Sequence, residues 1–181
     1  MFAFAYDKNR AIATVLYIAK KLGSTPRKPD MHRIFKVLYF ADQKHIAKFG
    51  RPVIGDTYIA MKDGPVPSQI YDMLKDVRDH LTGQFDDFFC VQNYYVTPRR
   101  DPDLDELSES DIEALDESIA ENGRLNYAQL RNKSHDNAYE RSTRNGRILI
   151  REIAKVSGAS PELLKYVTSR IELETAVARN R

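Results

Sequence analysis

The 181-residue chain has a single cysteine, Cys90, no tryptophan and a net charge of only +2. One thiol can neither close a disulfide within the chain nor build a cysteine-rich zinc site. The longest apolar stretch, residues 11–19, is interrupted by Thr14, whereas a helix that crosses a bilayer needs about twenty apolar residues. Asp7 and Lys8 lie where a signal peptide would be apolar. We therefore expect a protein of the reducing cytoplasm with no membrane partner.

The sequence also lacks the common signatures of enzymes. It has no glycine-rich phosphate loop, no Walker lysine and no Gly-x-Ser-x-Gly motif. Cys90 follows two phenylalanines and precedes a valine, a setting in which a thiol is expected to be a small buried apolar group. We therefore expect no catalytic residue and no cofactor.

A metal site is the strongest enzymatic alternative. His135 and Asp136 are adjacent, and three further histidines lie upstream: His32, His45 and His80. Helical phosphohydrolases of the HD type use such a His-Asp pair together with a distant downstream aspartate. No aspartate follows Asp136 in this sequence, and metal geometry tolerates few replacements. The favoured interpretation is that His135 begins a turn or bonds a backbone carbonyl, without a metal.

Acidic charge is concentrated in one segment. Residues 101–121 contain ten acidic side chains and no basic one, in a chain that is basic on both sides. Such a segment can dock a basic partner, or it can be the solvated face of a loop and helix, which we favour. The apolar residues recur at helical spacing, at Leu107, Ile112, Leu115 and Ile119. Asp111 and Glu113 are candidate partner contacts on this helix.

Hydrophobic periodicity and capping residues predict mostly helices. The predicted helices cover residues 7–22, 30–49, 68–81, 107–119, 127–133, 148–156 and 160–178. Asp30, Ser68 and Ser160 are the expected N-caps. Residues 57–61 predict a strand, and residues 85–91 and 94–97 predict a hairpin that turns around Gln92 and Asn93. We expect one compact, predominantly helical α+β domain over residues 1–181, with a small hairpin or short antiparallel sheet.

Basic residues near the C-terminus suggest a second possible partner. Arg141, Arg144, Arg147 and Arg151 are regularly spaced, as in a weak phosphate-binding surface. A solvated helical face explains the same spacing. Arg144 and Arg147 are therefore candidate contacts, and nucleic acid is a less favoured partner than protein.

The densest motif lies between residues 38 and 71. Its members are Leu38, Tyr39, Ala41, Asp42, His45, Gly50, Pro52, Gly55, Asp56, Tyr58, Ala60, Gly64, Pro65, Val66 and Tyr71. This ordered set resembles the Panacea domain of SocA-like antitoxins, some of which are described as phage-associated proteins. The resemblance continues at His135 and at Tyr139, which stands where a tryptophan is expected. It covers roughly residues 10–157.

The resemblance implies a bacterial antitoxin that neutralises a cognate toxin by direct binding. One branch of the family is similar to proteolytic adaptors that deliver a toxin to a AAA+ protease. Neither activity requires a catalytic residue. The alternative function is that of a phage or operon regulator that binds nucleic acid.

The motif also has a physical interpretation that is independent of the resemblance. Asp42 and His45 are three residues apart on one helix, so they can pair, and such a pair beside the turn at Gly55 and Asp56 can clamp the helix to the strand. This structural role is favoured over a binding role. The glycines are expected to let the backbone turn between helix, strand and helix.

Three surfaces are candidates for recognising a partner: the hairpin tyrosines Tyr94 and Tyr95, the acidic segment 101–121 and the C-terminal helix 160–178. Tyrosine supplies a large amphipathic contact area at a low entropic cost. Strand alternation predicts that one of the two tyrosines faces the core.

Overall fold

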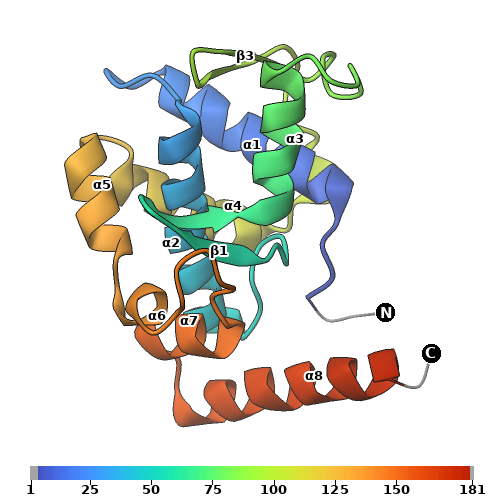
Figure 1. Ribbon diagram of the computed structural model, residues 1–181, viewed down its shortest axis with the longest axis vertical. Helices are drawn as coiled ribbons and strands as arrows, with labels where there is room; N and C mark the ends of the chain where they lie inside the picture. Colours follow the sequence, from blue (N-terminus) through green and yellow to red (C-terminus); the bar gives the residue numbers. More distant parts are fainter. Residues whose placement is uncertain (1–3, 180–181) are drawn as a thin grey trace.

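Helix α2 (Met31–Phe49) runs through the middle of the molecule, and most of its residues are buried (Figure 1). It contacts α1, α4, α5, α7 and strand β2. The computed structural model describes the backbone of residues 4–179 and the side chains of residues 4–173. When other elements pack around a helix on all sides, side chains on every face of that helix can be buried. Because of this central position, the residues of the family motif that lie on α2 are placed in the interior of the domain.

The other elements follow the expected order. In chain order they are α1 (Lys8–Gly23), α2, β1 (Tyr58–Met61), β2 (Gly64–Pro67), α3 (Ser68–Arg78), β3 (Phe89–Gln92), β4 (Tyr95–Pro98), a short 3₁₀ turn (Leu104–Glu106), α4 (Glu109–Asn122), α5 (Tyr127–Ser134), α6 (Asn137–Glu140), α7 (Ile150–Val156) and α8 (Pro161–Arg179). The predominantly helical α+β fold is confirmed. Within the described residues, none of the helices combines the length and apolar character that crossing a bilayer requires.

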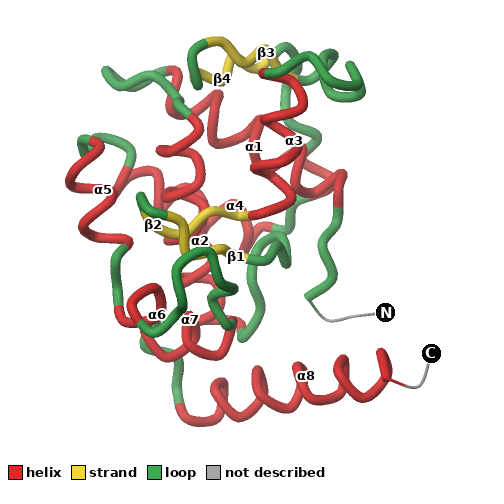
Figure 2. Tube along the Cα trace, viewed as in Figure 1, coloured by secondary structure: helices red, strands yellow, loops and turns green. Residues whose placement is uncertain are grey.

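Two separate antiparallel hairpins contain the four strands described in residues 4–179 (Figure 2). Strand β1 pairs with β2 so that Met61 lies opposite Gly64. Strand β3 pairs with β4 so that Gln92 lies opposite Tyr95. The β3–β4 hairpin is tied to the segment before α2, because the Val96 N–H donates to the Pro29 carbonyl at 2.8 Å.

The predicted turn of this second hairpin was displaced by one residue. The turn consists of Asn93 and Tyr94, both with positive φ (49° and 68°). A two-residue turn with both φ values positive matches the right-handed twist of the flanking strands. The first strand starts only at Phe89, and Cys90 is partly exposed, so the expectation of a buried thiol was wrong.

Helix α2 contributes to both hydrophobic clusters of the core. The larger cluster joins α1, α3, α4 and the β3–β4 hairpin to residues such as Ile34 and Leu38. The second joins Tyr39, Phe40 and Ile46 to apolar residues of β1 and of α5 to α8. Burial of these side chains supplies the main driving force for folding.

Helix α3 differs from its prediction at both ends. It stops at Arg78, and the chain turns through His80, whose φ is 52°. Leu81 is therefore 65% exposed instead of packing in the core. At the other end, Ser68 is the first helical residue and makes no capping bond. The expected caps at Asp30 and Ser160 do form.

Asp56 supplies the cap that Ser68 was expected to provide. Its carboxylate accepts the backbone N–H of Gln69 at 3.1 Å and that of Ile70 at 3.0 Å. An N-terminal turn leaves these donors without partners inside the helix, and a carboxylate also interacts favourably with the helix dipole. Asp56 thus joins the turn before β1 to the start of α3.

We predict that Asp56→Ala lowers the free energy of unfolding by about 1–2 kcal/mol, because α3 loses its cap. Urea denaturation followed by circular dichroism measures the change. Ser68→Ala, the matched control, should cost much less, since the Ser68 hydroxyl only donates to Asp56 at 3.2 Å. Equal losses in the two variants would contradict the assignment of the cap to Asp56.

Candidate functional site

Asp42 is the buried carboxylate of the family motif. It accepts the backbone N–H of Val53 and the hydroxyl of Tyr58, each at 2.7 Å. Burial raises the pKa of the Asp42 carboxyl to about 7. The two bonds attach α2 to the segment that leads into β1. Asp42 is therefore a clamp, as the sequence suggested, but its partners are Val53 and Tyr58 instead of His45.

His45 clamps the same helix to other partners. Its Nδ1 lies 2.8 Å from the Arg51 carbonyl oxygen, and its Nε2 lies 3.0 Å from the Ser110 hydroxyl. Because a carbonyl only accepts, Nδ1 carries a proton. The His45 Nε2 also lies 3.2 Å from Asp111 Oδ1. Burial lowers the pKa of the imidazole.

Asp111 was proposed as a partner contact, and the structure contradicts this. Its side chain is buried, and its Oδ1 lies 2.9 Å from Arg51 Nη1. Asp111 also completes a capping box with Ser108 at the start of α4. Helix α4 turns this carboxylate inward because the cap and the arginine satisfy it there.

Asp136 joins α2 to the C-terminal part of the chain. Its carboxylate accepts the Tyr39 hydroxyl at 3.0 Å and the Gln43 amide at 2.7 Å. The same carboxylate caps α6 through the N–H groups of Ala138 and Tyr139. Tyr39 is fully buried.

His135 and Tyr139 form a stacked pair, with ring centres 4.0 Å apart. The Tyr139 hydroxyl donates to the Met61 carbonyl at 2.9 Å, so this phenol has its own partner at the position where tryptophan was expected. In the part of the chain that the structure describes, no group of three or more His, Cys, Asp or Glu side chains is placed to hold a metal ion.

Lys36 brings a cation into the interior. Its side chain is fully buried, and its ammonium donates to the Pro65 carbonyl at 2.8 Å. Burial lowers the pKa of Lys36 to about 7. Gly64 makes room for it, because a Cβ there would lie 2.9 Å from Lys36 Cε and 2.5 Å from Ser134 Oγ. The φ of Gly64, 103°, also favours glycine.

The remaining motif residues serve the packing and the turns. Gly50 and Gly55 have positive φ, as expected of turns. Tyr71 is partly buried and packs edge-on against Phe35. The others are buried: Leu38, Ala41, Pro52, Ala60, Pro65 and Val66. The motif therefore builds the frame of the domain and presents little surface of its own.

A groove of about 850 Å³ lies where four parts of this frame meet. Its walls come from the N-terminal half of α2, the β1–β2 turn, α5 and the β3–β4 turn (Figure 1). Five aromatic side chains line it: Phe35, Tyr71, Tyr94, Tyr95 and Tyr127. We call it the tyrosine groove.

Both hairpin tyrosines lie on the wall of this groove. Tyr94 is 60% exposed and Tyr95 is 47% exposed, so the prediction that one faces the core was wrong. Tyr94 belongs to the turn, where strand alternation does not apply. The Arg78 guanidinium lies 4.9 Å from the centre of the Tyr94 ring, and the Lys28 ammonium lies 5.8 Å from that of Tyr95.

The opposite wall was not found from the sequence. Tyr127, at the start of α5, is 51% exposed. Its ring stacks on His32 of α2 at 4.2 Å between ring centres. The two residues are far apart in the sequence, and no local pattern indicates that they meet.

The acidic segment is largely paired within the chain. Glu113 and Glu117 bind Lys48, at 2.9 and 2.7 Å, and Glu121 binds Lys44 at 2.6 Å. Glu113 remains exposed, but its charge is matched by α2. This arrangement fits a solvated helix face whose carboxylates pair with lysines of the same chain.

The C-terminal arginines do not share a helix. Arg141, Arg144 and Arg147 lie in the segment between α6 and α7, and only Arg151 is on α7. Arg141 and Arg151 both approach Glu152. Arg144 and Arg147 are exposed. The interpretation of the spacing as a helical face was wrong for these residues.

Together these features define a helical α+β domain whose buried central helix supports an exposed aromatic groove. A family model described as antitoxin SocA-like, Panacea domain, matches residues 34–140. This is more than half of the chain, which therefore belongs to that family. The matched region is narrower than the expected 10–157. No curated protein and no solved structure gives a significant match.

We predict a pH-dependent stability from Asp42. Its raised pKa means that the folded chain keeps a proton that the unfolded chain loses, so stability falls as the pH rises from about 4 to 7. Asp42→Asn keeps an acceptor for Val53 and should therefore become more stable relative to the natural chain across this interval. Chemical denaturation at stepped pH measures the difference.

The exposed Asp72→Asn variant is the matched control for loss of a carboxylate. A difference between Asp42→Asn and the natural chain that stays constant from pH 4 to 7 would contradict the raised pKa.

For Lys36 the expected trend has the opposite sign. Its lowered pKa means that the unfolded chain binds the extra proton, so stability falls as the pH decreases from about 10 to 7. Lys36→Met removes the ammonium and should gain stability relative to the natural chain over that interval. The exposed Lys165→Met variant is the control. Parallel stability curves for Lys36→Met and the natural chain would show that Lys36 stays protonated throughout.

Proposed function

We propose that this protein is an antitoxin that neutralises a cognate toxin by direct binding and without catalysing a reaction. The observation that carries the proposal is the match to the SocA-like antitoxin family over residues 34–140. The buried state of the motif residues supports a scaffold role for them, since groups that hold the fold together are not free to react.

The tyrosine groove is the surface that we propose for the toxin. Exposed tyrosines bury a large area on binding and have few rotatable bonds to immobilise. Two backbone hydrogen bonds hold the hairpin that carries Tyr94 and Tyr95 against residues 29–31. The Met31 N–H donates to the Tyr94 carbonyl, and the Val96 N–H donates to the Pro29 carbonyl, each at 2.8 Å. A surface that is already ordered loses less entropy when a partner binds.

Direct inhibition and the adaptor role are alternatives that one experiment distinguishes. The protein encoded next to this chain is co-expressed with it from an inducible promoter. Restored growth with the toxic product still abundant indicates inhibition, whereas restored growth with its loss in a protease-proficient host only indicates an adaptor. An unrescued host and no co-purification would overturn the antitoxin proposal.

Substitutions of the groove tyrosines test where the co-purified partner binds. We predict that the double variant Tyr94→Ala, Tyr95→Ala weakens binding of the co-purified partner by about thirty-fold, as expected when a hot spot worth about 2 kcal/mol is lost. Affinity measured by calorimetry reports the change, and circular dichroism checks the fold.

Tyr166→Ala is the matched control, because Tyr166 on α8 is exposed to the same extent as Tyr95, 47%. It should leave the affinity within about two-fold, since most interface-distant substitutions have small effects. The reverse pattern would place the toxin on α8, another candidate surface.

A further inference from the structure

We propose that the tyrosine groove receives an acidic segment of a protein partner, in which carboxylate side chains alternate with apolar ones. This inference rests on the proposed function, because it assumes that the groove binds protein. It adds the chemistry of the segment that is bound.

The carboxylates of the groove are already paired. Asp30 caps α2 and lies 3.6 Å from the Arg33 guanidinium. Asp63, in the β1–β2 turn, lies 3.3 Å from Arg131 Nε. These two acids therefore attract little further positive charge, and a basic partner finds no unpaired carboxylate among the described side chains that line the groove.

By contrast, three cations around the groove are not matched by carboxylates of the described residues. Arg27 and Lys62 line it, and Lys28 covers the ring of Tyr95. All three are exposed. Within residues 4–173, none of the three forms an ion pair with a carboxylate, and the Arg27 guanidinium donates to the Arg124 carbonyl, at 3.1 Å. The unmatched charge of the rim is positive, which complements an acidic segment.

The floor between these cations is apolar. Met31, Phe35 and Val66 line it and are almost fully buried in the core beneath. An apolar side chain that enters the groove therefore contacts hydrocarbon and tyrosine rings, while acidic neighbours along the same segment reach the rim. Alternating acidic and apolar residues meet both requirements.

Protein is favoured over single-stranded nucleic acid because little ring surface is available for stacked bases. His32 already covers one face of Tyr127, and Arg78 lies over Tyr94.

Three probes test the inference directly. The first is a ten-residue peptide of alternating glutamate and leucine with one central tryptophan. The second has lysine in place of each glutamate, and the third is a fluorescein-labelled oligonucleotide of twelve thymidines. Because the protein has no tryptophan, the peptide's tryptophan emission reports its own environment without background.

We expect the acidic peptide to bind at least about ten-fold more tightly than the lysine peptide or the oligonucleotide at low salt, and to weaken several-fold as salt screens the rim charges. Equal or tighter binding of the lysine peptide or of the oligonucleotide overturns the inference. So does the absence of binding by the acidic peptide.

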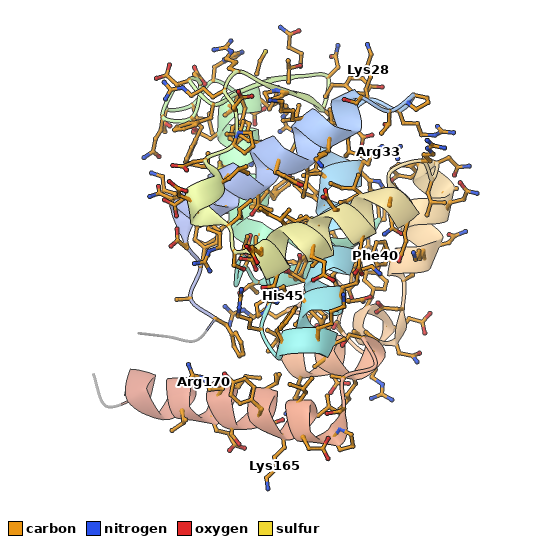
Figure 3. All side chains as sticks on the ribbon, turned by 180° about the vertical axis from the view of Figure 1, so that it is seen from behind. Lys28, Arg33, Phe40, His45, Lys165 and Arg170 are labelled. Atoms are coloured by element: carbon orange, nitrogen blue, oxygen red, sulfur yellow. The ribbon has the colours of Figure 1, made fainter. Side chains whose placement is uncertain are left out.

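Charge-reversal variants locate the binding. Lys28→Glu and Lys62→Glu should each weaken the acidic peptide about five-fold or more. Lys165→Glu is the matched control with the same change of charge. Figure 3 shows Lys28 near one end of the molecule and Lys165 on α8 near the other. Equal weakening by all three variants would indicate general attraction and overturn the proposed site.

The failure of this inference can be distinguished from failure of the proposed function. If growth rescue depends on Tyr94 and Tyr95 but the partner's affinity is unchanged in Lys28→Glu and Lys62→Glu, the antitoxin function stands and the acidic segment is wrong. If the acidic peptide binds through the rim but no rescue occurs, the binding chemistry stands and the antitoxin function is wrong.

Discussion

The attachment of α2 to the segment that follows it, through Asp42, is the interaction on which the rest of the structure depends. One buried carboxylate binds both Val53 and Tyr58. Lys36 and His45, which precede and follow Asp42 on the same helix, also attach it to later residues, through the carbonyls of Pro65 and Arg51. Buried polar groups are costly unless they are bonded, so only a narrow set of positions for residues 50–67 satisfies all three.

This constraint connects the family motif to the groove. With β2 held against α2, the β1–β2 turn lies on the same side of the molecule as the β3–β4 turn (Figure 1). Residues of both turns line the tyrosine groove. Most motif residues are inside the frame, whereas Tyr94, Tyr95 and Tyr127 stand on its surface. A stable frame that carries exposed aromatic walls suits a protein that acts by binding, because the frame and the walls can change independently.

The sequence predicted what local patterns determine. The order of the main helices, the caps at Asp30 and Ser160 and the α+β class all follow from periodicity and turn chemistry. The sequence-based prediction failed where partners are distant. Asp42 and His45 were expected to pair because they are three residues apart, but both bond the segment that follows α2, and His45 also contacts Ser110. The cap of α3 comes from Asp56, twelve residues before Ser68. The pairing of Tyr127 with His32 depends on the tertiary fold alone.

The most direct test of binding through the tyrosine groove is amide hydrogen exchange of the protein alone and with the co-expressed partner bound. We predict slower exchange in residues 61–64, 93–96 and 126–129, which form the walls, with α8 unchanged. Slower exchange confined to α8, with the three wall segments exchanging as in the free protein, would contradict this prediction.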